Sequence, residues 1–199
     1  MIRQPDYDRA ATCACRVLIR AGVRTLPVRP RALLAGMGNV ALLTYEQAAE
    51  VLAMAPRDFD RRAGDADAFT FRESGAGGAR YVVCYRAGGN PARLNFTLAH
   101  ELGHIALGHA ALSAAEEAEA DCFAEHLLCP PPVVARLTTP EAVSRTCYVS
   151  LSAARMIRLR RRGQVDASTR RALDALLTDY LRTISDTKRA NVRIQTNIP

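Results

Sequence analysis

Apolar residues recur at helical spacing between residues 96 and 110, which predicts the most informative helix of the chain. Its apolar stripe is formed by Leu98, Leu102 and Ile105, spaced as on one face of a helix with 3.6 residues per turn. Asn95 is the predicted N-cap, and Gly108 is positioned to end the helix. One face of this helix should therefore pack in the core and leave the other free for polar side chains.

A second helix is predicted over residues 115–130, where the run Pro130-Pro131-Pro132 ends it. Its apolar stripe consists of Ala120, Phe123, Ala124 and Leu127. This stripe should pack on the first helix and bring the polar residues of both helices close together.

The region before these helices predicts a small sheet. Alternating or apolar runs at residues 40–45, 66–72 and 80–86 are typical of strands. Residues 73–78 are too glycine-rich for a strand, so they are interpreted as the turn of a hairpin. Residues 56–64 are interpreted as a charged loop.

The two ends of the chain are predicted to be helical. Residues 6–22 form an amphipathic helix, and residues 31–34 form a short one. Residues 140–162 are predicted to be two helices joined by a tight turn at 148–150, a helix-turn-helix-like unit. A last amphipathic helix covers residues 167–184.

His100, Glu101 and His104 lie at the centre of the helix over residues 96–110. On an α-helix His100 and His104 stand one above the other, so that their imidazole nitrogens can reach one ion. Glu101 projects about 100° away from His100, where it could act on a water molecule held by that ion. The His-Glu-x-x-His spacing is typical of zinc hydrolases and predicts Glu101 as the general base. The alternative is a pair of packing histidines in a non-catalytic protein.

A catalytic zinc site needs a third protein ligand and an open fourth position. Glu117 and Asp121 on the second helix are four residues apart and share a face. Glu117 is the predicted third ligand, and Asp121 is predicted to accept the outer N–H of one ligating histidine. Four other candidates are excluded as ligands because their helical angles direct them away from the metal: Glu116, Glu119, His109 and His126. The two histidines among them are predicted to face solvent.

These motifs together resemble the ImmA/IrrE family of metallopeptidases. Its segments Thr-x-Ala-His-Glu-x-Gly-His, Glu-x-x-Ala-(Asn/Asp)-x-Phe-Ala and Leu-Leu-x-Pro correspond to residues 97–104, 117–124 and 127–130. Leu26-Pro27-Val28 is similar to the family's entry segment, so the resemblance extends over residues 5–135.

The resemblance implies a zinc metallo-endopeptidase with His100, His104 and Glu117 as zinc ligands and Glu101 as the base. Its implied substrate is a regulatory protein, such as a helix-turn-helix repressor of a mobile element or stress circuit. The expected fold class is α+β, with a zincin-like core, a small sheet beside the active-site helix and a helical C-terminal appendage. The predicted division is a peptidase core over 1–135, an appendage over 136–186 and a flexible tail over 187–199.

The net charge of +7 is unevenly distributed. Residues 94–135 contain no Lys or Arg but several carboxylates, which suits a cation site. Arginines concentrate after residue 135, above all between Arg155 and Arg162. These arginines could contact nucleic acid, although a packing role for this helix is favoured.

No apolar run approaches a membrane span, and the first nine residues are too polar for a signal peptide, so a cytoplasmic protein is expected. The six cysteines lack Cys-x-x-Cys spacing, which favours free thiols.

Several alternatives stay open from sequence. The protein could be a DNA-binding regulator with a silent or structural metal site, or a binding module of a toxin–antitoxin pair. Zinc is favoured by two imidazoles and a carboxylate, but manganese or iron could bind the same ligands. Tyr45, Tyr81, Tyr85 or an arginine could stabilise the oxyanion of a peptidase reaction.

Overall fold

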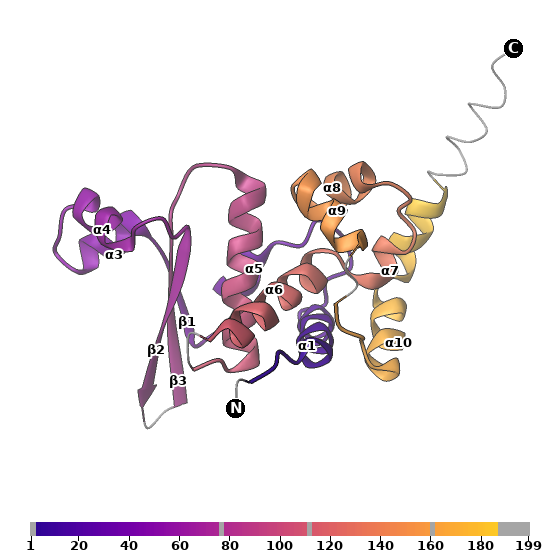
Figure 1. Cartoon of the computed structure of the whole chain (residues 1–199), viewed down its shortest axis with the longest axis horizontal. Coiled ribbons are helices and arrows are strands. Elements are labelled where there is room, and N and C mark those ends of the chain that lie inside the picture. Colours follow the sequence, from indigo (N-terminus) through magenta and orange to yellow (C-terminus); the bar gives the residue numbers. More distant parts are fainter. Residues whose placement is uncertain (1–2, 76–77, 111–112, 160–161, 187–199) are drawn as a thin grey trace, which may run out of the picture.

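A three-stranded sheet is placed beside a cluster of helices in the computed structural model (Figure 1), which describes residues 3–75, 78–110, 113–159 and 162–186. The strands are β1 (Val40–Thr44), β2 (Ala68–Gly75) and β3 (Gly78–Tyr85). The helices are α1 (Tyr7–Arg20), α2 (Pro30–Ala35), α3 (Tyr45–Val51), α4 (Pro56–Ala63), α5 (Pro91–Leu107), α6 (Ala114–Leu128), α7 (Pro131–Val134), α8 (Pro140–Cys147), α9 (Leu151–Leu159) and α10 (Ala167–Leu176). The chain is thus a mixed α+β protein, as the sequence predicts.

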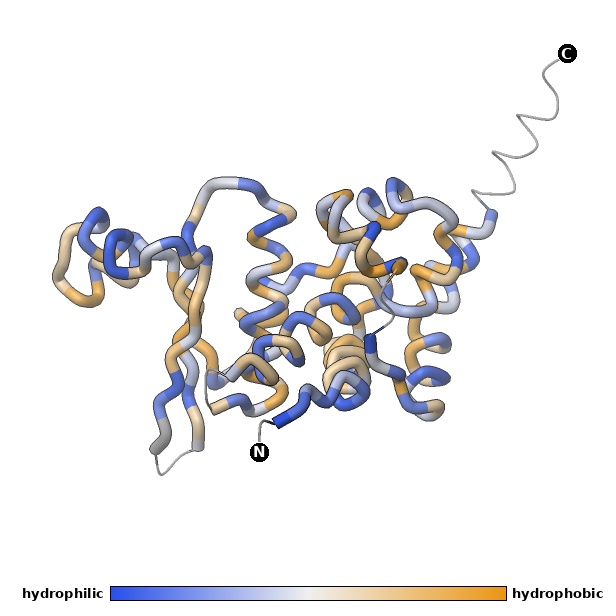
Figure 2. Tube along the Cα trace, viewed as in Figure 1, coloured by the Kyte–Doolittle hydropathy of each residue, from blue (hydrophilic) through white to orange (hydrophobic). Residues whose placement is uncertain are grey.

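The strand order is β1-β3-β2, which leaves β2 at an edge of the sheet. β3 pairs in parallel with β1 and antiparallel with β2. The β2–β3 hairpin was expected, but its strands are longer than predicted because β2 reaches Gly75 and β3 begins at Gly78. Each strand of the hairpin has a hydrophilic stretch in its half nearer the turn, whereas the other half is mostly apolar (Figure 2).

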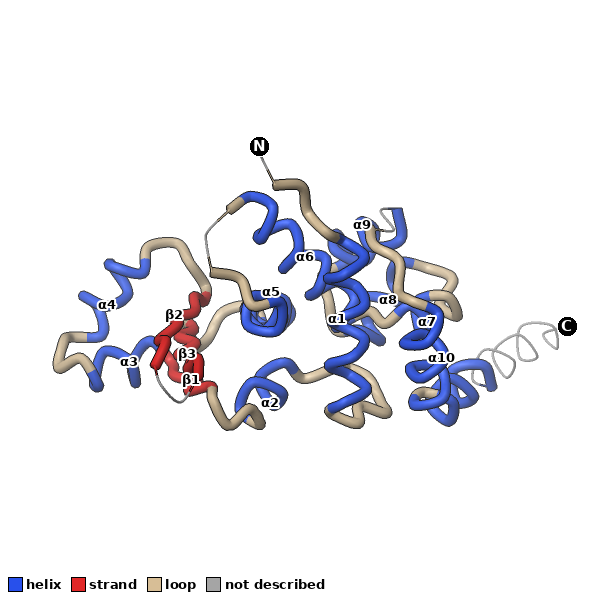
Figure 3. Tube along the Cα trace, turned by 90° about the horizontal axis from the view of Figure 1, so that it is seen from below, coloured by secondary structure: helices blue, strands red, loops and turns tan. Residues whose placement is uncertain are grey.

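Helices cover both faces of the sheet (Figure 3). On one face α3 and α4 enclose a small apolar cluster around Tyr45, Phe59 and Cys84. On the other face, α5 and α2 begin the larger core. Residues 56–63 are therefore a helix and not the predicted charged loop, because Pro56 begins the helix and Phe59 is its apolar anchor in this cluster.

Helix α5 begins one turn earlier than expected. Its N-cap is Asn90, whose side chain accepts hydrogen bonds from the backbone N–H groups of Ala92 and Arg93, and Pro91 occupies the first helical position. The prediction of Asn95 as the N-cap was wrong. Gly108 ends the helix in the left-handed conformation, with φ of 67°. The helix thus places residues 100–104 in its second half.

Helices α5 and α6 approach closely where Gly103 lies against Phe123. A Cβ atom added to Gly103 would lie 3.1 Å from Cδ1 and 3.2 Å from Cβ of Phe123. The predicted stripe of α6, including Phe123, is fully buried. The absence of a side chain at residue 103 therefore sets the separation of the two helices.

We expect Gly103→Ala to lower the free energy of unfolding by about 1–2 kcal/mol, since overpacking a core outweighs the gain in helix propensity of about 1 kcal/mol. Urea unfolding measures this loss. Gly38→Ala is the control, because no atom lies within 4 Å of its added Cβ and its φ is not positive. A Gly103→Ala protein as stable as the parent would contradict the close approach.

The C-terminal helices join the same hydrophobic core as α1, α5 and α6. Val143, Ala154, Leu173 and Leu177 are each at most 1% exposed and belong to this core. The helix-turn-helix-like unit is present as α8 and α9, and Tyr148 takes the left-handed conformation in its turn, with φ of 55°. The predicted boundary at residue 135 stays a prediction, and the predicted tail over 187–199 lies outside the described residues.

The described helices include none that is both long and apolar enough to cross a membrane.

Candidate metal centre

Three side chains from α5 and α6 converge on one point. Nε2 of His104 lies 3.0 Å from Nε2 of His100. The carboxylate of Glu117 lies 3.2 Å from Nε2 of His100 and 3.4 Å from Nε2 of His104. Among the described residues, these three form a group of His, Cys, Asp and Glu side chains able to hold a metal ion.

The spacing of these donor atoms fits a tetrahedral metal ion. Ligand bonds of about 2.0–2.2 Å place neighbouring donors of a tetrahedron about 3.3–3.6 Å apart. The two imidazole nitrogens lie 3.0 Å apart, and different oxygens of Glu117 lie 3.2 Å from His100 and 3.4 Å from His104, so the cluster is close to this size. Two imidazoles and a carboxylate are also a common ligand set of catalytic zinc. His100, His104 and Glu117 therefore fit the metal that the sequence predicts.

His100 is oriented from α6 by Asp121. Nδ1 of His100 lies 2.9 Å from Oδ1 of Asp121. Burial lowers the pKa of His100, but the hydrogen bond and charge of Asp121, together with the charges of Glu101 and Glu117, outweigh burial and raise it. Because Asp121 accepts the proton on Nδ1, Nε2 carries the lone pair that faces Glu117 and His104.

His104 is held neutral by its surroundings. Burial, followed by the nearby imidazoles of His100 and His109, lowers the pKa of His104 to about 4. A neutral imidazole is the form that binds a metal ion. The side chains of His100 and His104 are 17% and 15% exposed, whereas that of Glu117 is 48% exposed. The donor cluster therefore sits under a solvent-accessible carboxylate.

Glu101 is buried next to the sheet and contacts an unexpected partner. The hydroxyl of Thr70, on β2, donates a hydrogen bond of 2.5 Å to Oε2 of Glu101. Burial raises the pKa of Glu101, and the hydrogen bond from Thr70 opposes this shift. Sequence reasoning did not identify Thr70, because the contact joins residues 31 positions apart in the chain.

A cavity of about 810 Å³ opens between β2 and α5. We call it the site cavity. Its lining includes all three donor residues, Glu101 and residues 68–72 of β2. In the described residues β2 pairs with β3 alone, so the other edge of β2 is free beside the cavity. The arrangement can accommodate an extended peptide next to the metal ligands.

Of the candidate oxyanion donors, Tyr81 lines the site cavity. The hydroxyl of Tyr45 donates to the carbonyl of Ala66, and the ring of Tyr45 belongs to the cluster under α3 and α4. The ring of Tyr85 lies under the guanidinium of Arg31. Arg72 pairs with Tyr81 across the strands and lines the cavity too.

The remaining acidic and histidine candidates do not belong to the donor group. Glu116 and Glu119 contact Arg3, in agreement with their predicted exclusion from the metal. His126 is half-buried and bonds the carbonyl of Cys122. His109 is buried against His104. His126 was predicted to face solvent and is partly exposed. The prediction of solvent exposure was wrong for His109, because the chain leaves the helix at Gly108 and helical angles no longer apply.

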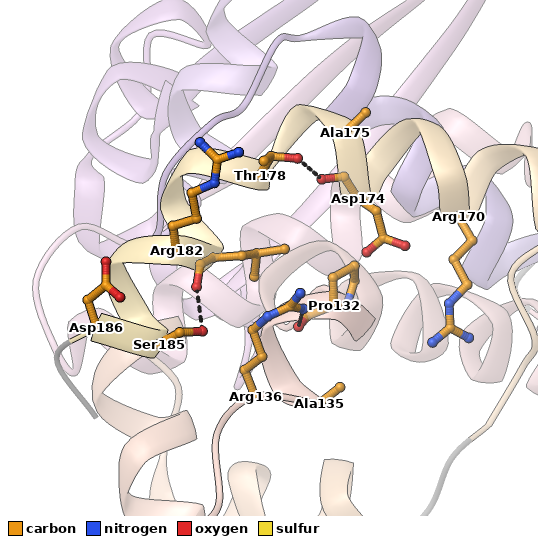
Figure 4. A pocket seen from close by; sticks show the side chains of 11 residues that line it. Pro132, Ala135, Arg136, Arg170, Asp174, Ala175, Thr178, Arg182, Ser185 and Asp186 are labelled. Atoms are coloured by element: carbon orange, nitrogen blue, oxygen red, sulfur yellow. Dashed lines mark hydrogen bonds between the residues drawn. The ribbon is translucent and has the colours of Figure 1, made fainter. Parts of the chain in front are cut away.

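The arginine-rich C-terminal part has its own contacts. The guanidinium of Arg158 donates to the carbonyl of Leu137, and that of Arg162 lies over the ring of Tyr7. Arg155 is exposed. A separate cavity of about 650 Å³ mixes arginines with Asp174 and Asp186 (Figure 4). These contacts favour packing over a continuous basic surface.

Residues 51–145 match the family model Peptidase_M78, which describes the IrrE N-terminal-like domain. This segment belongs to the ImmA/IrrE family. The resemblance drawn from the motifs is thus confirmed for the part of the chain that holds them, whereas its predicted extension back to residue 5 stays a prediction. The IrrE N-terminal-like match contains α5 and α6 and ends within α8. No curated protein matches the chain. The match of this segment supports a metal-dependent peptidase with a protein substrate.

Proposed function

We propose that the protein is a zinc-dependent endopeptidase with a zincin-like core. The observation that carries this proposal is the convergence of His100, His104 and Glu117 on one point beside the buried carboxylate of Glu101 and an open cavity. When bound, zinc supplies Lewis acidity to the scissile carbonyl and to the attacking water molecule.

The protein's own side chains have three further roles: metal binding, proton transfer and orientation of the reacting groups. His100, His104 and Glu117 hold the ion, and Asp121 fixes the ring of His100. Glu101 takes the proton of the attacking water and delivers it to the leaving nitrogen. Thr70 orients Glu101 by its hydrogen bond to Oε2.

The substrate is aligned by the sheet in this proposal. An extended peptide would pair with the free edge of β2, where backbone hydrogen bonds provide affinity that depends little on side chains. Tyr81 or Arg72 would donate to the developing oxyanion, because both line the site cavity. Such an alignment suits cleavage at an exposed linker.

The proposed substrate is a regulatory protein of the helix-turn-helix repressor class, which rests on resemblance to the family. We expect the purified protein to cleave a repressor encoded next to it. A chelator should abolish cleavage, and added zinc should restore it. Gel electrophoresis and mass spectrometry of the products measure both effects.

The rival functions give different results in the same experiment. A DNA-binding regulator would bind DNA in a salt-sensitive way, with no loss on metal removal. A binding module of a toxin–antitoxin pair would bind zinc and its partner without cutting it. Either outcome, in place of chelator-sensitive cleavage, would contradict the endopeptidase.

A further inference from the structure

His109 is placed against His104 by the end of helix α5. After the left-handed Gly108, the backbone N–H of His109 donates to the carbonyl of His104 at 3.0 Å. The side chain of His109 is 3% exposed, and its Nδ1 lies 3.0 Å from Nδ1 of His104. A buried imidazole thus faces the ring nitrogen of His104 that points away from the donor cluster.

The other nitrogen of His109 faces Glu119. Nε2 of His109 lies 3.0 Å from Oε2 of Glu119, whose side chain is fully buried. The guanidinium of Arg3 donates to both oxygens of Glu119, at 2.8 and 3.0 Å, and the backbone N–H of Asp6 donates to Oε1 at 2.9 Å. The guanidinium of Arg9 is 3.5 Å from Oε2.

Arg3 and the Asp6 N–H both donate to Glu119, and Arg9 places a second guanidinium beside it. A carboxylate surrounded by these donors accepts hydrogen bonds and donates none. Glu119 therefore requires His109 to carry its proton on Nε2.

A neutral imidazole with its proton on Nε2 presents a lone pair on Nδ1. In His109 this lone pair faces Nδ1 of His104 and can accept only if His104 carries its own proton there. The remaining nitrogen of His104, Nε2, then points its lone pair toward His100 and Glu117.

We propose that His109 and Glu119 are positioning residues that fix the ring and tautomer of His104 for metal binding. The inference rests on the proposed metal site and adds to it. Each ligating histidine would then have an anionic anchor on α6: Asp121 acts directly on His100, and Glu119 acts on His104 through the imidazole of His109.

Three substitutions of His109 separate this role from simple packing. In His109→Asn the amide oxygen takes the place of Nδ1 and keeps an acceptor for His104. In His109→Gln the amide nitrogen takes the place of Nε2 and keeps a donor for Glu119. His109→Leu has nearly the shape of the asparagine and keeps neither hydrogen bond.

Zinc affinity, measured by competition with a chromogenic chelator, is the main readout. We expect His109→Leu and His109→Gln to bind zinc about 10–100-fold more weakly than the parent, as for other groups that orient a ligating histidine. His109→Asn should bind several-fold more tightly than His109→Leu. The visible spectrum of the cobalt-substituted protein should be parent-like only in His109→Asn.

Thermal unfolding of the metal-free proteins provides the contrast. The melting temperature should fall less in His109→Gln than in His109→Asn, because only the glutamine keeps a partner for the buried Glu119. If His109→Leu does not fold, the comparison of zinc affinity between His109→Asn and His109→Gln still tests the inference. Equal zinc affinity of these two variants, or parent affinity in His109→Gln, would overturn the inference.

The parent protein distinguishes this failure from that of the proposed function. If the parent binds no zinc, the proposed metal site is wrong. If the parent binds zinc tightly and His109→Gln binds it equally well, the metal site stands and only the proposed role of His109 and Glu119 is wrong.

Discussion

Glu101→Gln is expected to lower kcat by about 10²–10⁴-fold, the range for loss of a general base. Glutamine has nearly the shape of glutamate, and its amide oxygen can still accept the hydrogen bond from Thr70. It cannot take a proton from the attacking water. Cleavage of the repressor under saturating conditions measures kcat, and atomic absorption should find zinc in the parent amount.

Glu141→Gln is the matched control for this variant. It makes the same chemical change at an exposed position on α8, and its kcat should equal that of the parent. A Glu101→Gln protein with parent kcat would show that the base has been wrongly assigned. Loss of zinc from the variant would instead place Glu101 among the ligands.

Glu117→Ala should weaken zinc binding by more than about 100-fold, beyond the loss usual for residues that only orient a ligand. It removes the carboxylate whose oxygens lie 3.2 and 3.4 Å from the two imidazoles. Because this side chain is about half exposed, its removal leaves the core intact. The metal-free variant should therefore have the same melting temperature as the metal-free parent.

Asp121→Asn provides the graded comparison. Its amide oxygen can still accept from Nδ1 of His100, but the charge is lost, so zinc affinity should fall by no more than about 10–100-fold. Chelator competition measures both variants. If Glu117→Ala bound zinc as tightly as Asp121→Asn, Glu117 would not be the third ligand.

Local spacing was sufficient to predict which residues of α5 and α6 share a face. Helical geometry alone indicates that His100 and His104 point the same way, and that Glu117 and Asp121 do. The fully buried stripe of α6 likewise follows from its pattern of apolar residues. The shared faces could be predicted because the two residues of each pair lie about one turn apart on a single helix.

Contacts between distant segments could not be predicted in this way. Helical angles exclude Glu119 from the metal but do not predict its partner, Arg3, which lies more than a hundred residues away in the chain. The side chain of Glu119 thus belongs to a buried network and not to the metal. Thr70 lies beside Glu101 because β2 pairs with β3 next to α5. The sequence of α5 alone does not predict this contact.

Turn and cap residues explain the remaining differences. His109 was treated as part of a continuous helix, but the left-handed Gly108 folds it back onto His104. The charged stretch over 56–63 became a helix because one aromatic residue, Phe59, anchors it against Tyr45. In both places the conformation is set by one residue, Gly108 or Phe59, and not by the overall composition of the segment.

The N-terminal and C-terminal helices share one hydrophobic core, so neither can be changed independently of the other. Leu173 and Leu177 are buried in the core that contains α1, a helix that precedes the residues of the family match. A different C-terminal part could be acquired only together with a compatible surface on α1. Replacing the C-terminal helices would therefore uncover apolar residues of α1 unless α1 were changed with them.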